Sequence, residues 1–430
     1  MLESFLAIGI LDGPLLTVVY GLAAAAFAAL LVRRRLRHWW LTALLSVVAG
    51  AATGLVVLWA LVDLIDAFGE GAVAHETYFW IAAAFAGTAL ALANFWMSRW
   101  WRKLIAVAGV ALFIVAAVLG VNASFGLNPT VGSLFGISTT PDIKVPEHTD
   151  SSADPSAPLW QSWHPPADMP ATGEVGEVDI PSTASGWDAR PAQLYLPPAA
   201  LVDDPPELPF ILMMMGQPGN PDAGFVGEVL DRFAAEHDGL APIVLVVDQL
   251  GEPEADPLCL DTAMGHVETY VMTDAVGWAR DRLNILEDRR FWAVAGYSNG
   301  GGCAAYYGAK YPDVWGGIIS LSGVKYPGVE HSAQVLEDVF GGDEAAYDAV
   351  KPTTIMGAHR YTDTTAVFTA GEDDPAYVEW AEANDEAAAA AGMDTTLVIV
   401  PEADHGVSAL TGGLDAAFPV FYPRWTLAAP

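Results

Sequence analysis

The residue best placed to do chemistry is Ser298, which lies in the stretch Gly296-Tyr297-Ser298-Asn299-Gly300. An apolar run at 291–295 precedes this stretch and an alanine-rich segment follows it, which predicts a buried strand, a tight turn and a helix. Glycine is needed on both sides of such a turn because a Cβ atom there would collide with the strand or the helix. The pattern is that of a nucleophile elbow and predicts Ser298 as an attacking group.

A serine hydroxyl is a poor nucleophile until a base accepts its proton, and the base needs an acid to fix its tautomer. His405 follows a predicted strand at 395–400, and three carboxylates at 372–374 follow another at 366–369. Catalytic groups of a doubly wound sheet lie just past the carboxyl ends of strands, so these groups should meet Ser298. The order serine, acid, histidine is that of an α/β-hydrolase. Consecutive residues cannot all face one imidazole, which leaves the choice of acid open.

The oxyanion formed by attack on an ester needs two backbone N–H donors. The N–H of Asn299, the residue after the nucleophile, is the first expected donor. The second should come from the chain just past the apolar run 209–215, where Pro218 has no N–H and Gln217 or Gly216 is left. No cluster of His, Cys and carboxylate residues has the spacing of metal ligands, so we expect neither a metal nor a cofactor.

The elements that must position these residues are strands alternating with helices. Such an alternation predicts an α/β fold, a doubly wound and mostly parallel sheet with helices on both faces. The predicted strands are 174–180, 190–196, 209–215, 243–247, 291–295, 317–321, 366–369 and 395–400, and the predicted helices are 223–236, 269–283 and 376–391.

Four apolar stretches without Asp, Glu, Lys or Arg precede this region, at about 14–32, 39–62, 78–97 and 104–121. Each is long enough to cross about 30 Å of hydrocarbon as a helix. All seven basic residues of this part lie at 33–37 and 99–103, whereas the intervening loop is acidic. The positive-inside rule then places the N-terminus and everything after residue 122 outside the cell. Without ionisable residues at membrane depth, the segment should serve as an anchor or docking platform rather than as a transporter.

Three parts follow from this pattern: a four-helix transmembrane domain at 1–122, a proline-rich linker at 123–172 and an extracellular hydrolase domain at 173–430. Residues 123–430 carry 12 Lys and Arg against 46 Asp and Glu. A surface this acidic repels polyanions, so no nucleic-acid partner is expected. Its simplest interpretation is a solvated, soluble face. Protein partners cannot be named from the sequence.

The chain has two cysteines, Cys259 and Cys303, and both fall in the predicted outer domain. Disulfides form and persist in such an oxidising compartment. A bridge between them would tie the loop after the 243–247 strand to the helix that follows Ser298. The alternative is a pair of unlinked buried thiols.

These residues together resemble the esterase D-like family of α/β-hydrolases, which is related to feruloyl esterases and mycolyltransferases. The resemblance covers about residues 173–410, and its closest branch has a multi-helix membrane anchor before the esterase domain. It rests on Arg190-Pro191, Tyr195-Leu196-Pro197-Pro198, Gly216-Gln217-Pro218-Gly219, Cys259-Leu260-Asp261, Glu268-Thr269-Tyr270, Gly296-Tyr297-Ser298-Asn299-Gly300-Gly301, Tyr311-Pro312 and Ser322-Gly323.

The resemblance implies hydrolysis or transfer of acyl esters through an acyl-enzyme. Family members commonly place the acid three residues after the turn glycine, which makes it Asp374 here, followed by Asp373 and then Glu372 as alternatives. One departure concerns the oxyanion hole. Many members have His-Gly after the first buried strand, where this chain has Met215-Gly216.

Two functions compete at this stage. The first is a membrane-anchored extracellular serine esterase or acyltransferase that acts on cell-envelope or environmental esters, using Ser298, His405 and Asp374. The second is a catalytically silent hydrolase fold that serves as an envelope scaffold, with its helices docking membrane partners. The intact set of serine, acid and histidine favours the enzyme.

The charge pattern yields a test of topology. Single cysteines placed at Leu36 or Ser98 should resist an impermeant thiol reagent in intact cells, because the basic loops lie on the cytoplasmic side. A cysteine at Ser151 should react. The reverse labelling pattern would overturn the extracellular assignment and remove the argument for a disulfide.

Overall fold

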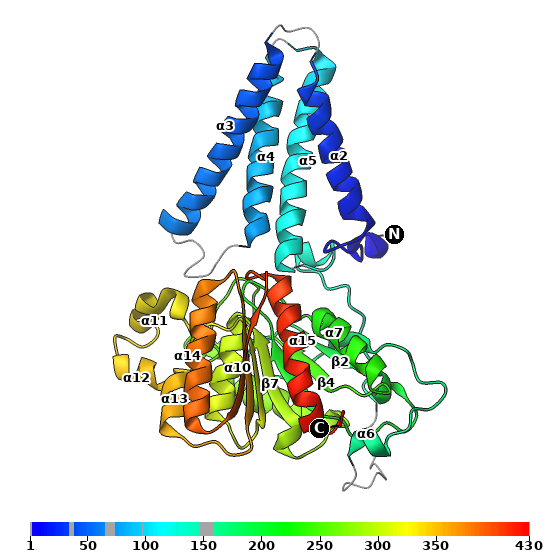
Figure 1. The fold of residues 1–430 in the computed structure, drawn as a ribbon, viewed down its shortest axis with the longest axis vertical. Coiled ribbons are helices and arrows are strands. Elements are labelled where there is room, and N and C mark those ends of the chain that lie inside the picture. The colour runs from blue at the N-terminus through cyan, green and yellow to red at the C-terminus, as the bar shows by residue number, and fades with distance from the viewer. Residues whose placement is uncertain are drawn as a thin grey trace. The chain divides into compact units, whose positions relative to one another are not determined.

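The computed structural model describes residues 2–33, 38–64, 74–96, 98–126, 128–146 and 158–429. The chain forms two compact units, Met1–Thr139 and Thr140–Pro430 (Figure 1). Arg34–Arg37, most of the acidic loop and the Asp150-Ser151-Ser152 run of the predicted linker lie outside the described residues.

The first unit is helical. Among its described residues, four helices are long and apolar enough to cross a membrane by length and composition (Figure 1). Small residues allow close packing, since a Cβ on Gly50 would lie 2.5 Å from the Phe85 carbonyl oxygen. The helices are α1 (Leu2–Leu6), α2 (Pro14–Leu31), α3 (Trp39–Trp59, continued by a π-turn at Ala60–Leu64), α4 (His75–Ala93) and α5 (Trp100–Phe125).

The last two spans differ from the predicted 78–97 and 104–121. Helix α4 ends at Ala93 because the Asn94 side chain turns back and donates to the Leu90 carbonyl at 2.9 Å. Helix α5 begins earlier and includes Arg102, whose guanidinium donates to the carbonyls of Val32 at 3.0 Å and Leu30 at 3.1 Å. An arginine at the carboxyl end of α2 satisfies carbonyls that have no partner within their own helix.

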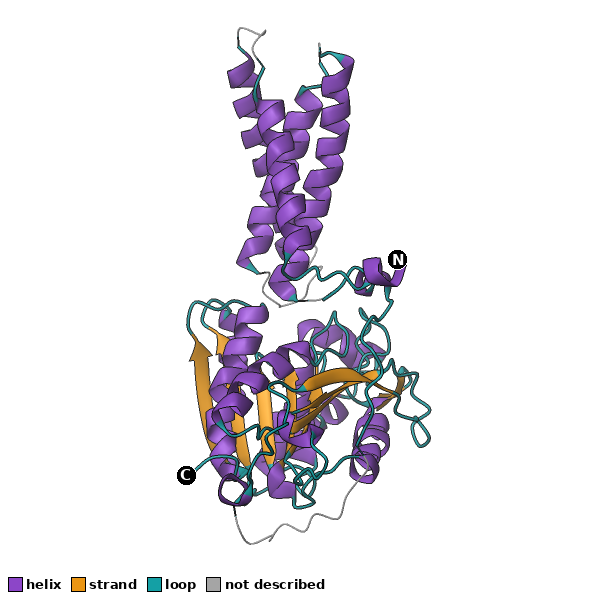
Figure 2. Cartoon of the chain, turned by 90° about the vertical axis from the view of Figure 1, so that its right-hand side faces the viewer, coloured by secondary structure: helices purple, strands orange, loops and turns teal. Residues whose placement is uncertain are grey.

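The second unit is built on an eight-stranded sheet with the order β1-β2-β4-β3-β7-β8-β9-β10 (Figure 2). Strand β2 pairs antiparallel with both of its neighbours, and all pairs from β4 to β10 are parallel. The α/β-hydrolase fold is therefore confirmed. The strands are β1 (Glu174–Val178), β2 (Ala192–Leu196), β3 (Phe210–Met214), β4 (Ile243–Val247), β7 (Trp292–Tyr297), β8 (Gly317–Leu321), β9 (Thr365–Gly371) and β10 (Asp394–Val400), while β5 (Asp261–Thr262) and β6 (Gly265–His266) form a separate pair.

Helices cover both faces of this sheet, and alternate residues of the strands face them. On β8, Ile318 packs with Ala305 of α10, whereas Ile319 belongs to the larger core that contains Phe418 of α15. The helices are α6 (Leu159–Ser162), α7 (Gly224–Glu236), α8 (Val267–Thr269), α9 (Val276–Arg282), α10 (Asn299–Lys310), α11 (Ser332–Asp338), α12 (Glu344–Ala349), α13 (Pro352–Ala358), α14 (Pro375–Ala391) and α15 (Val407–Arg424).

Most predicted bounds in this unit shift by one or two residues in the structure, and two elements illustrate the difference. The predicted strand 190–196 begins at Ala192, because Pro191 has no N–H and the Arg190 N–H is donated to Asp248 instead. The predicted helix 269–283 starts at Val267 and is interrupted by a π-turn at Tyr270–Ala275.

The end of the predicted linker packs on the second unit. The indole N–H of Trp163 donates to the Asp238 carbonyl at 2.9 Å, and the Trp160 N–H donates to the Thr426 carbonyl at 3.0 Å. The short helix α6, which contains Trp160 and ends just before Trp163, is therefore held by the hydrolase fold.

The Arg190–Asp248 pair provides a test of what stabilises this unit. Asp248 is fully buried, and Arg190 Nη2 lies 2.6 Å from its Oδ1. Arg190→Ala should lower the free energy of unfolding by about 3 kcal/mol, because it leaves a buried carboxylate without its cation. Arg232→Ala breaks the exposed Arg232–Asp415 pair and should cost about 0–1 kcal/mol. Denaturant unfolding of the detergent-solubilised chain measures both, and equal losses would contradict the prediction.

Candidate active site

Ser298 lies at the turn between β7 and α10, with a left-handed backbone (φ 55°). The turn is possible only because glycines surround it. A Cβ on Gly296 would lie 2.0 Å from the Gly300 carbonyl oxygen, and one on Gly300 would lie 2.2 Å from the Met214 carbonyl oxygen. The Ser298 N–H donates to the Leu321 carbonyl at 2.9 Å, which fixes the turn to the end of β8.

His405 lies between Ser298 and Asp374. Its Nε2 is 2.9 Å from Ser298 Oγ, and its Nδ1 is 2.7 Å from Asp374 Oδ2. A proton on Nδ1 lets the ring donate to the carboxylate and accept from the serine hydroxyl. All three side chains are buried, and Asp374 is 0% exposed. This geometry suits proton transfer from the serine to the imidazole.

The two other candidate acids point elsewhere. Glu372 is exposed, and its Oε2 accepts the Glu402 N–H at 3.0 Å. Asp373 is exposed as well, while its backbone N–H donates to the Ala403 carbonyl at 2.9 Å. Only Asp374 of the three is brought to His405.

The predicted oxyanion donors, the N–H groups of Asn299 and Gln217, belong to segments of backbone that adjoin Ser298. A Cβ on Gly216 would lie 3.2 Å from Ser298 Cβ, so the backbone after β3 passes beside the nucleophile. The Gly300 N–H donates to the Met215 carbonyl at 3.1 Å, which fastens this backbone to the start of α10. The Gln217 side chain turns away and donates to the Glu254 carbonyl at 2.7 Å. The assignment of the Asn299 and Gln217 N–H groups remains a prediction.

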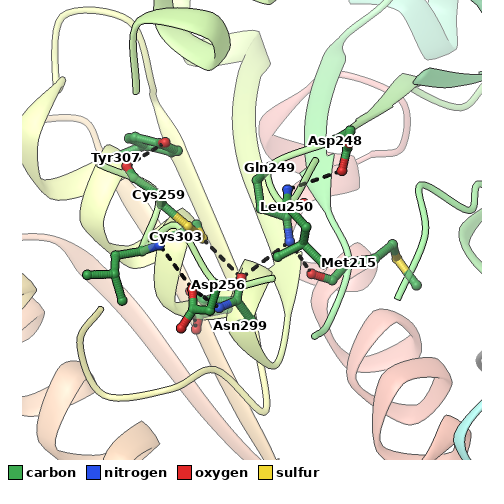
Figure 3. Close-up of a disulfide and its surroundings, with 12 residues drawn as sticks. Met215, Asp248, Gln249, Leu250, Asp256, Cys259, Asn299, Cys303 and Tyr307 are labelled. Carbon is green, nitrogen blue, oxygen red and sulfur yellow. Dashed lines mark hydrogen bonds between the residues drawn. A yellow bond between two sulfur atoms is a disulfide. The ribbon is translucent and has the colours of Figure 1, made fainter. Parts of the chain in front are cut away.

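Two polar side chains that were not predicted from the sequence, Gln249 and Asp256, brace this region (Figure 3). Gln249 donates to the Met215 carbonyl at 2.6 Å and to Asn299 Oδ1 at 3.3 Å. Asn299 Nδ2 donates to Asp256 Oδ1 at 3.1 Å, and burial raises the pKa of the Asp256 carboxyl. The one signal for Gln249 was its place just after the end of a buried strand.

Cys259 and Cys303 are joined by a disulfide, with their Cα atoms 5.7 Å apart (Figure 3). The Tyr307 hydroxyl donates to the Cys259 carbonyl at 2.8 Å, so α10 holds the same loop a second time. The loop that carries Gln249 and Asp256 is thereby fixed to the helix that follows the nucleophile. Across the residues that the structure describes, no three His, Cys, Asp or Glu side chains are grouped as metal ligands would be.

Comparison with known proteins adds to this geometry. The family model described as "Putative esterase" matches residues 182–406, which include every residue of the site above. An uncharacterised protein of Corynebacterium glutamicum is 32% identical over 301 residues, which cover 67% of this chain and 68% of that protein.

Solved structures resemble this chain in fold. A ferulic acid esterase superposes with a TM-score of 0.50 at 17% identity, over 59% of this chain and 98% of its own. An S-formylglutathione hydrolase from Agrobacterium tumefaciens has a TM-score of 0.49 at 17% identity, over 60% of this chain and 98% of its own.

The disulfide can be tested directly. Mass spectrometry of the digested protein without reductant should give one linked peptide pair that contains Cys259 and Cys303, because the structure brings these two sulfurs together. The 43 residues between them form a loop whose closure contributes about 3–4 kcal/mol in the chain-entropy picture. Two freely alkylated thiols under the same conditions would exclude the bridge.

Proposed function

Because the chain belongs to the putative esterase family and is a hydrolase, we propose that it is a serine esterase or acyltransferase whose triad is Ser298, His405 and Asp374. The observation that carries this proposal is the position of His405 within hydrogen-bond distance of both other groups. The acid on Nδ1 and the serine on Nε2 give the imidazole the orientation that a general base needs.

The reaction follows from these contacts. His405 accepts the proton of Ser298 as Oγ attacks the ester carbonyl, and Asp374 stabilises the imidazolium that forms. The backbone N–H groups of Asn299 and Gln217 would bind the developing oxyanion. The imidazolium then gives its proton to the leaving alkoxide, and an acyl-enzyme remains on Ser298. An incoming water or alcohol, deprotonated by His405, releases the acyl group.

The four apolar helices would anchor this enzyme in a membrane as a multi-pass protein. Basic residues at 33–37 and 99–103 favour an orientation with the N-terminus and everything after residue 122 on the extracellular side. Cell-envelope or environmental acyl esters would then be the accessible substrates. The acceptor, water or a sugar hydroxyl, is to be found by offering a panel of esters with and without trehalose.

Substitution of each carboxylate in turn tests the triad. Asp374→Asn should reduce turnover by up to about four powers of ten, because an amide favours the wrong tautomer of His405. Asp373→Asn and Glu372→Gln are matched controls and should retain most activity, since both side chains are exposed. Hydrolysis of a p-nitrophenyl ester measures all three. A crippled Asp373→Asn beside an active Asp374→Asn would identify the wrong acid.

Active-site labelling distinguishes an active serine hydrolase from the catalytically silent scaffold. A fluorophosphonate should label the wild-type chain and fail to label Ser298→Ala, because only an activated serine attacks the probe. Absence of Ser298-dependent labelling in a folded protein would favour the silent scaffold.

A further inference from the structure

Two tyrosine rings lie against the imidazole of His405. The Tyr297 centroid is 5.5 Å away with an interplanar angle of 22°, and the Tyr377 centroid is 4.0 Å away with an angle of 39°. The hydroxyl of Tyr297 donates to the backbone carbonyl of His405 itself at 3.1 Å. The Tyr377 hydroxyl instead donates to Glu330 Oε1 at 3.1 Å, which brings a second carboxylate into the surroundings of the base.

Tyr377 and Glu330 come from separate elements that converge on the site. Tyr377 lies on the first turn of α14, three residues after Asp374, and is 1% exposed. Glu330 lies in a 3₁₀ turn, Val329–His331, in the long connection between β8 and β9, and is half-buried.

We propose that Tyr377 and Glu330 form a positioning pair for His405, an inference that rests on the proposed triad. The ring of Tyr377 packs against the imidazole, whose Nδ1 faces Asp374. Glu330 holds that ring in place by accepting a hydrogen bond from its hydroxyl. Glu330 also places a negative charge near the imidazolium that forms when Ser298 loses its proton. Such a charge stabilises the transition state more than the ground state, in which the imidazole is neutral.

The electrostatics of the site agree with this arrangement. Burial raises the pKa of Glu330, and the nearby charge of Asp256 raises it further, whereas the Tyr377 hydrogen bond and the charges of His405 and His331 lower it. Burial also raises the pKa of the Tyr377 hydroxyl, and the nearby charges of Glu330 and Asp374 raise it further. Glu330 supports His405 only when ionised, so its contribution is present above its raised pKa and is lost as the pH falls through that value.

The test uses the full chain in detergent and follows hydrolysis of p-nitrophenyl acetate. Glu330→Gln should lower kcat about tenfold at about pH 8 while KM stays within about twofold, because the lost charge acts on the imidazolium. The deficit should shrink as the pH falls, since wild-type Glu330 then becomes neutral like the amide. Tyr377→Phe should cause a smaller loss, because Glu330 then keeps its charge but no longer holds the ring. The loss in the double variant should be smaller than the product of the two single losses, because the two residues are coupled through their hydrogen bond.

Matched controls come from the same connection. Tyr347→Phe removes a hydroxyl that donates to the Pro327 carbonyl, and Glu337→Gln removes an exposed carboxylate, so neither should change kcat. A deficit of Glu330→Gln that is absent, or equal at every pH, would overturn the proposal, as would losses that multiply in the double variant. If Asp374→Asn stays active, the triad itself fails. If it is crippled while Glu330→Gln behaves as wild type, only the positioning pair fails.

Discussion

The whole site depends on a strained turn. Ser298 has a backbone conformation that residues with a Cβ adopt at a cost of about 1–3 kcal/mol, so its surroundings must impose it. They do so from the end of β8 and the chain just after it: Leu321 accepts the Ser298 N–H, and the Ser298 carbonyl accepts the N–H of Val324. This backbone conformation directs the Ser298 hydroxyl toward His405. In a regular strand the side chain would instead point to one face of the sheet.

The same turn also sets the oxyanion side of the site. Because Gly300 has no side chain, the first turn of α10 approaches the end of β3 closely enough for its N–H to bond the Met215 carbonyl. Gln249 donates to that carbonyl as well, from a loop that the disulfide and Tyr307 hold against α10. One close approach of two backbones thus determines where the nucleophile and the expected N–H donors stand relative to each other.

Much of this was predictable from local sequence. The apolar run, the flanking glycines and the alanine-rich segment predict the turn at Ser298 without any long-range information, and His405 follows from its place at a strand end. The directions of the carboxylates at 372–374 could not be predicted from local sequence. They depend on hydrogen bonds between the turn at 371–374 and the distant residues Ala403 and Glu402. The resemblance to esterases, rather than periodicity, selected Asp374.

Other differences between the predicted and the observed elements also come from contacts between residues far apart in the chain. The start of β2 was misplaced because the backbone of Arg190 serves Asp248, a residue 58 positions away. The early start of α5 was missed because Arg102 was counted as a loop charge, although its guanidinium completes the carboxyl end of another helix. Polar side chains whose partners lie far along the chain look unremarkable in sequence, and they are the ones that fix an element's end or orient a catalytic group. Tyr377 and Glu330 are of the same kind: they lie 47 positions apart in the chain, and the imidazole against which Tyr377 packs gives their hydrogen bond a chemical consequence.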